Sequence, residues 1–161
     1  MLGWSEVRAE FVWDGSWRDL CVRAANLDDW QHVLDALRVA GFSMEYTVAG
    51  VPSELPLQVS EVFMRSVEGC LLSVTTAGVL LVTQFFDEDE IVFDLDPREV
   101  VGQVELDAAL AFMKVLACAT GKDALMTPEN MHDVPFIRVD AAGNGEYESS
   151  GGFFESRVEP S

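Results

Sequence analysis

The chain has few basic residues. Lysine and arginine together number 10, against 28 aspartate and glutamate residues, so the 161-residue sequence carries a formal net charge of −18. Proteins that bind nucleic acid or anionic membranes need a basic face that contacts phosphate groups. The composition therefore argues against both of these partners and favours a protein partner of positive charge.

Cysteines, long apolar runs and leader-like features are also scarce. The three cysteines, Cys21, Cys70 and Cys118, are too few for a disulfide framework and odd in number, which favours a reducing compartment. No apolar run approaches the roughly 20 residues that a membrane-spanning helix needs. Residues 1–6 lack the basic and apolar regions of a signal peptide. We therefore expect a cytoplasmic protein.

Apolar residues are plentiful by contrast. They make up 49% of the sequence, which is enough to bury a sizeable core and excludes wholesale disorder. The length fits one domain. We expect a single domain over residues 1–150, followed by a loose tail over residues 151–161, which contain Gly, Ser and Pro.

Two segments have the periodicity of amphipathic helices. The first begins after Asn26 or Asp28, either of which can cap a helix, and ends at Gly41, a typical stop. The second covers residues 105–120. Residues 57–66 are ambiguous, with apolar positions that suit one face of a short helix.

Several shorter segments are rich in β-branched and apolar residues, and turn residues separate them. Residues 91–95 alternate between apolar and mostly acidic side chains, as in a strand with one buried face. The predicted strands are 7–13 and 17–22, joined at Asp14–Gly15; 42–48; 70–74 paired with 79–85; 91–95; 125–126; and 136–139 paired with 146–149. This order predicts an α+β fold, in which two or three helices pack on one face of an antiparallel sheet.

Chemical signatures are weak. His32 and His132 have no motif that ties them to a nucleophile, and the simplest interpretation of each is a surface or locally hydrogen-bonded side chain. Cys21 and Cys118 lie in apolar or helical stretches where a thiol behaves as a small hydrophobe, whereas Cys70 follows a glycine and could be partly exposed. The sequence has no glycine-rich nucleotide loop and no nucleophile elbow. We predict no catalytic, cofactor-binding or metal-binding residue.

Almost half of the net charge lies in residues 87–107, which contain nine acidic residues and one basic residue. The run starting at Asp87 resembles a calcium loop, but Ile91 stands where an oxygen ligand belongs. Glycosidases use a pair of catalytic carboxylates. Because this sequence contains many carboxylates, it neither excludes nor indicates such a pair. The remaining interpretations are a solvated sheet edge and a binding surface.

Two phenylalanines directly precede these acids, and aromatic residues bordered by one sign of charge are typical of an interface core with a steering rim. The chain is therefore predicted to bind a basic protein through this segment. The predicted contact residues are Phe85, Phe86, Asp87, Glu88, Asp89, Glu90, Asp94 and Asp96.

Residues 85–100, together with residues 110–122 and Thr127-Pro128-Glu129-Asn130, resemble blocks found in small bacterial immunity proteins. These proteins protect a cell from its own polymorphic, contact-delivered or type VI-secreted toxins. The resemblance covers about half of the chain and implies a non-enzymatic cytoplasmic protein that binds one cognate toxin domain and blocks its active site. It implies no catalytic residues, and the acidic contact surface is inferred from charge alone.

Two other functions remain open. One is an acidic DNA mimic or adaptor that binds a nucleic-acid-handling protein. The other is a small hydrolase or transferase that uses scattered carboxylates, which a deep pocket with two converging acids would favour and a shallow acidic face would disfavour.

Overall fold

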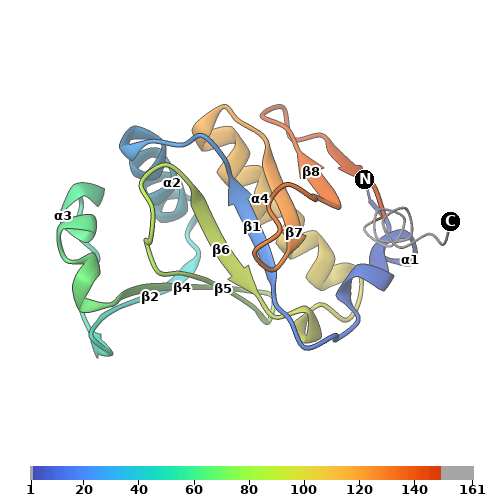
Figure 1. Cartoon of the computed structure of the whole chain (residues 1–161), viewed down its shortest axis with the longest axis horizontal. Helices are drawn as coiled ribbons and strands as arrows, with labels where there is room; N and C mark the ends of the chain where they lie inside the picture. The colour runs from blue at the N-terminus through green and yellow to red at the C-terminus, as the bar shows by residue number, and fades with distance from the viewer. Residues whose placement is uncertain (1, 150–161) are drawn as a thin grey trace, which may run out of the picture.

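Nine strands form one antiparallel sheet in the computed structural model, which describes residues 2–149 (Figure 1). Their order across the sheet is β3-β2-β4-β5-β6-β1-β7-β8-β9. The bounds are β1 Arg18–Val22, β2 Ser43–Val48, β3 Val51–Pro52, β4 Cys70–Thr76, β5 Val79–Thr83, β6 Ile91–Leu95, β7 Ala124–Pro128, β8 Ile137–Val139 and β9 Gly145–Tyr147. The predicted tail over 151–161 lies outside the described residues.

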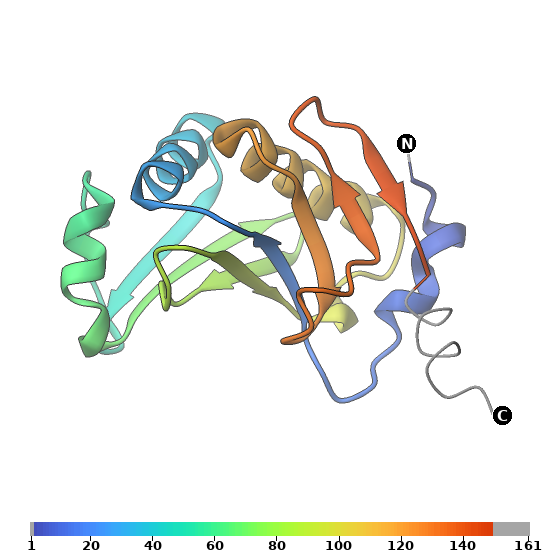
Figure 2. The ribbon, with the colours of Figure 1, turned by 45° about the horizontal axis from the view of Figure 1, so that its top comes forward.

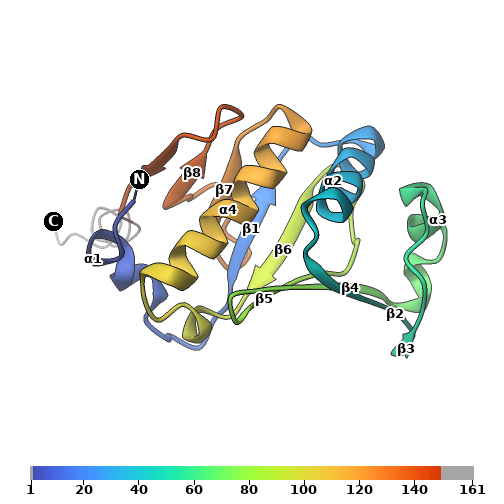
Figure 3. The same cartoon turned by 180° about the vertical axis from the view of Figure 1, so that it is seen from behind.

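Two long helices pack together against one face of this sheet, and Figure 3 shows them in front of it. They are α2 (Leu27–Ala40) and α4 (Gln103–Thr120). The Asn26 side chain accepts a hydrogen bond from the backbone N–H of Asp29 (2.8 Å), and α2 ends at Gly41, whose φ of 73° suits glycine. The predicted fold class and both helices are confirmed.

The remaining helices are short. They are α1 (Trp4–Val7), η1 (Arg8–Phe11), α3 (Val59–Met64), η2 (Ser66–Glu68) and η3 (Pro97–Glu99). The ring of Phe63 on α3 lies 5.6 Å from that of Trp30 on α2, which fixes α3 to the rest of the core. Among residues 2–149, no helix combines the length and apolar character needed to cross a membrane.

The predicted hairpin around Asp14–Gly15 is wrong in its first arm. The chain there is helical in α1 and η1, and only β1 forms a strand, which pairs with β6 and β7. The side chain of Arg18 explains the detour, because it is buried and donates hydrogen bonds to the carbonyls of Glu10 (2.7 Å) and Val12 (3.0 Å). These bonds hold the incoming chain folded back on the start of β1.

Three smaller expectations also fail. Cys70 is 1% exposed because its thiol packs beneath α3, whereas Cys118 is exposed on α4. The strand predicted over residues 125–126 is longer in the structure, because Thr127 and Pro128 extend β7 and pair with β1. The pairing of β8 with β9 is confirmed, with Ile137 opposite Tyr147.

The sheet opens between β5 and β6, and this opening positions the candidate site (Figure 2). These two strands pair at two positions, Leu81 with Leu95 and Val82 with Asp94. Because their other ends diverge, residues 84–90 must span the space between them. We call residues 84–90 the acidic loop.

Candidate functional site

The acidic loop separates two adjacent aromatic residues into different environments. Phe85 has a positive φ of 54°, a conformation that costs a non-glycine residue about 1 kcal/mol or more. This bend places its ring in the core, 0% exposed and 5.1 Å from the ring of Trp30. Phe86 points outward and is 83% exposed. Phe86 is therefore available to a partner, whereas Phe85 anchors the loop.

Two hydrogen bonds fix the backbone of the acidic loop to the start of α2. The indole Nε1–H of Trp30 donates to the carbonyl of Asp87 (3.1 Å), and the N–H of Ala25 donates to that of Asp89 (2.9 Å). The side chains of Asp87, Glu88 and Asp89 remain exposed. A tethered backbone reduces the entropy that a partner must overcome to order these carboxylates on binding.

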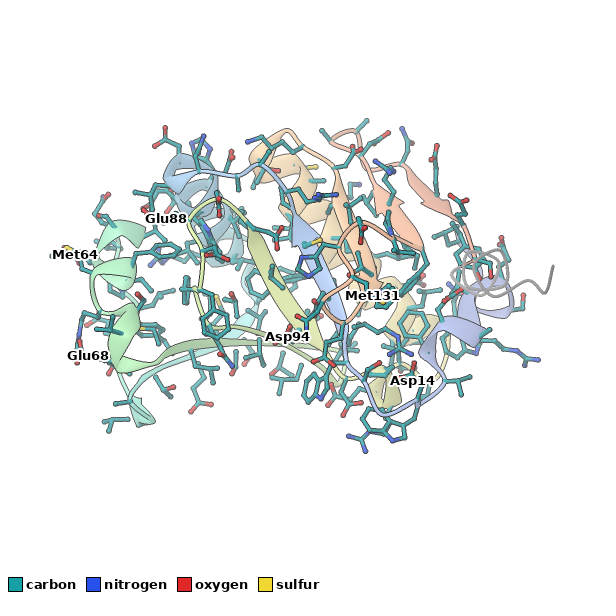
Figure 4. All side chains as sticks on the ribbon, in the orientation of Figure 1. Asp14, Met64, Glu68, Glu88, Asp94 and Met131 are labelled. Atoms are coloured by element: carbon teal, nitrogen blue, oxygen red, sulfur yellow. The ribbon has the colours of Figure 1, made fainter. Side chains whose placement is uncertain are left out.

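An open groove of about 740 Å³ runs between the acidic loop and α3. Its apolar wall includes Phe63, Phe86 and Met64, the last of which is 80% exposed. Asp87, Glu88 and Asp89 form its rim. Figure 4 shows Met64 and Glu88 at the same end of the molecule. The groove thus combines exposed apolar side chains with negative charge.

A second, more enclosed space of about 320 Å³ lies on the other side of the acidic loop, against β1 and β6, and reaches Trp30 of α2. We call it the acidic cavity. Asp19 on β1 stands directly opposite Asp94 on β6 in the antiparallel register, so both carboxyl groups enter the cavity from adjacent strands. Figure 4 shows Asp94 near the loop that carries Met131. The other ionisable lining residues are Asp87, Glu90, Glu129 and His132.

His132 joins two of these acids. Its Nε2 lies 2.7 Å from Oδ2 of Asp19, and its Nδ1 lies 2.6 Å from Oε1 of Glu90. Ionised carboxylates only accept hydrogen bonds, so both ring nitrogens must carry hydrogen and the ring is an imidazolium. The hydrogen bond with Asp19 raises the pKa of His132 above its usual value, burial opposes this, and Glu90 adds to the increase.

Asp19 and Asp94 have opposite pKa shifts. Burial opposes ionisation of Asp19, but hydrogen bonds from His132 and from the N–H of Asn130 (3.0 Å) outweigh it and lower the pKa of Asp19. Burial, together with the neighbouring Asp19, raises the pKa of Asp94 to about 7. Near neutral pH the cavity therefore holds one firmly ionised acid next to one that titrates.

Cys21 lies on the same face of β1 as Asp19, two residues further along. Burial, reinforced by the charges of Glu90 and Asp19, raises the pKa of its thiol to about 12. A thiol with that pKa is almost fully protonated at neutral pH and is therefore a poor nucleophile.

The structure divides the eight predicted contact residues among four environments. Phe85 is buried and cannot contact a partner in the folded chain. Asp96 lies beyond the far end of β6, where it caps η3 and pairs with Arg98 at 2.9 Å. Glu90 and Asp94 line the acidic cavity, and Phe86, Asp87, Glu88 and Asp89 form the exposed part of the acidic loop.

Sequence reasoning missed Asp19 and Glu129 as site residues and left His132 as an ordinary histidine. One signal for Asp19 was present, since it is an acid inside a strand that is otherwise largely apolar. His132 is hydrogen-bonded, but its two partners are not local, because they come from β1 and the acidic loop, far away in the sequence.

Within residues 2–149, no group of three or more His, Cys, Asp or Glu side chains is arranged to hold a metal ion. In the acidic cavity the reason is physical, because the carboxylates occupy both nitrogens of His132. Comparisons with protein-family models, with curated proteins and with solved structures find no match to this chain.

Proposed function

We propose that this chain is a cytoplasmic immunity protein that binds a basic toxin domain and blocks its active site. The observation that carries the proposal is the position of Phe86, an exposed ring on a tethered loop whose next three side chains are exposed carboxylates. Such a ring can anchor a partner by burial, while the surrounding charges select and steer it.

The charge of the chain supports the same proposal. A net charge of −18 destabilises a compact protein through self-repulsion, so a binding advantage would offset this cost. Toxins that act on nucleic acid or nucleotides present basic clefts for phosphate. Carboxylates placed in such a cleft would replace the phosphates, and electrostatic steering raises association rates to about 10⁸ M⁻¹s⁻¹ at low salt.

The test is co-expression of the chain with the product of the neighbouring gene. The proposal predicts a stable complex and loss of the partner's toxicity. A triple variant, Asp87→Lys with Glu88→Lys and Asp89→Lys, should slow association, and Phe86→Ala should speed dissociation. Glu45→Lys on β2 is a control for a single charge reversal outside the acidic loop, to be compared with Asp87→Lys, Glu88→Lys and Asp89→Lys made one at a time, because Glu45 is exposed and lies on β2.

The partner that co-purifies from the native cell also separates this proposal from a DNA mimic or adaptor. A nucleic-acid-handling protein of the host or of a phage, in place of a toxin, would contradict the immunity function while retaining the acidic surface. A complex that survives both the triple variant and Phe86→Ala would contradict the proposed contact surface itself.

One observation favours a second candidate, an acid–base hydrolase. Asp19 and Asp94 converge in a cavity, and their pKa values are shifted in opposite directions, which is typical of an acid and base pair. Two acids that converge in a pocket are the feature that distinguishes an enzyme from a protein with a shallow acidic surface. Turnover of chromogenic phosphoester, ester or glycoside substrates that is lost in Asp94→Asn would support this candidate, and no turnover by the wild-type protein would discard it.

A further inference from the structure

The acidic cavity contains an unpaired acceptor. Asp19 is 2% exposed, and its Oδ2 is occupied by His132 and by the backbone of Asn130. Its Oδ1 is buried and receives no hydrogen bond from an N–H donor of residues 2–149, and the neighbouring Asp94 can donate to it only while Asp94 is protonated. A buried carboxylate oxygen without a donor is unfavourable, so once Asp94 is ionised an external donor would be favourable here.

The surroundings of this oxygen favour a cationic donor. Asp94, Glu90 and Glu129 line the same cavity, and His132 is the cation that faces them there. A planar guanidinium or an ammonium group can donate several hydrogen bonds to carboxylates and can neutralise their charge. An anion would meet like charge, and a neutral donor would leave that charge uncompensated.

The cavity has the size and walls for the end of a basic side chain. Its volume of about 320 Å³ exceeds the space of one water, and Trp30, Phe85 and Val92 contribute apolar surface beside the acids. The methylene groups of an arginine or lysine pack well against such walls while the charged end reaches the carboxylates. Phe86 and Asp87 line both the cavity and the open groove, so a bound partner could reach both.

We propose that the acidic cavity binds the guanidinium or ammonium group of an arginine or lysine side chain of the partner, held between Asp19 and Asp94. The source of the cation rests on the proposed function, whereas the site itself does not. A probe cation should therefore bind whether or not the toxin is ever identified.

Binding at this site is coupled to a proton. When the cavity is empty, Asp94 can hold a proton and share it with Oδ1 of Asp19. A bound cation replaces that proton, so affinity should rise about tenfold per pH unit below pH 7 and level off above it. Four groups face Asp94. They are Asp19 on β1, Glu129 directly after β7, His132 in the loop that follows, and Glu90 directly before β6, the strand that carries Asp94.

The experiment is an NMR titration of the full chain with N-methylguanidinium, with N-methylurea as a neutral probe of the same shape and triarginine as the side-chain source. We expect N-methylguanidinium to bind with a dissociation constant on the order of 1–10 mM at pH 8 and low salt. The amides of Asp19, Asp94, Asn130 and His132 should shift. N-methylurea should leave them unchanged, and triarginine should shift them at lower concentration.

Two variants and one control make the titration decisive. Asp94→Asn keeps the side-chain shape. It should lower the affinity for N-methylguanidinium at least tenfold and remove the pH dependence of this affinity. Glu129→Gln should lower this affinity severalfold, and Glu45→Gln, which lies outside the cavity, should leave the affinity unchanged. Equal binding of N-methylurea, or equal affinity in Asp94→Asn and wild type, would overturn the site. If N-methylguanidinium binds and triarginine does not, the proposal that a side chain of the partner supplies the cation is overturned.

Discussion

Replacing Asp94 with asparagine should stabilise the protein at alkaline pH and have no effect at acid pH. Burial beside Asp19 raises the pKa of Asp94 from 3.8 to about 7 in the folded protein. Protonated Asp94 therefore favours the folded state, and this contribution is complete below pH 3.8 and is lost as the pH rises through 7. Asparagine keeps the shape and a donor for Oδ1 of Asp19, and it never ionises.

The size of the effect follows from the shift. About three pKa units at 1.36 kcal/mol each give an upper limit of about 4 kcal/mol. Asp94 is only half-buried and solvent screens part of this energy, so we expect a gain of about 2 kcal/mol at pH 8. At pH 4 both side chains are neutral and the two proteins should have equal stability.

The assay is urea unfolding of wild type and Asp94→Asn at several values between pH 4 and pH 8, with Glu45→Gln as a charge-matched control. The difference between the two unfolding free energies cancels the titration of groups that do not interact with Asp94, provided that the m-values agree. An asparagine variant that is less stable than wild type at pH 8, or a difference that does not change with pH, would refute the reasoning.

The remaining predictions concern the acidic loop and His132. Phe85→Ala should lower the free energy of unfolding by about 3–5 kcal/mol because it empties a fully buried aromatic site, whereas Phe86→Ala should change it by less than about 0.5 kcal/mol; chemical denaturation of both checks this, and equal losses would contradict the opposite orientations. Reversing the charges of residues 87–89 should leave thermal stability unchanged or slightly higher while weakening the salt dependence of partner association, measured by stopped flow, and an unaltered salt dependence would exclude these residues from steering. His132→Ala should cost about 3–5 kcal/mol at pH 6, because it leaves the buried Asp19 carboxylate without its charged partner. The stability from His132 is complete below pH 6.5 and is lost as the pH rises through its raised folded pKa, so a loss that is larger at pH 9 than at pH 6 would contradict this pairing.

Local signals in the sequence predict much of the fold. The helical spacing between Asn26 and Gly41 identifies α2 together with both of its ends, because capping and the left-handed stop are properties of single residues. The alternation in residues 91–95 identifies β6 and assigns Ile91 and Phe93 to the core face. The prediction of a strand before Asp14 is wrong because apolar residues at positions 7 and 11 also fit one face of a helical segment. The contacts of Arg18 decide between strand and helix.

The candidate site is less accessible to sequence reasoning. Phe85 and Phe86 are identical in type, and only the backbone bend at Phe85 decides which of them is buried. The cluster of Asp19, Asp94 and His132 forms because β1 pairs with β6 and the loop after β7 folds over both strands. Such pairings between distant segments cannot be derived from local periodicity.

The most direct test of the central claim measures how fast the chain associates with the purified toxin domain of the neighbouring gene, and how that rate depends on salt. A basic toxin captured by the acidic loop should bind with a nanomolar dissociation constant, and its association rate should fall at least tenfold between 50 and 500 mM salt. No complex at 10 μM protein, or an association rate that salt leaves unchanged, would contradict the claim.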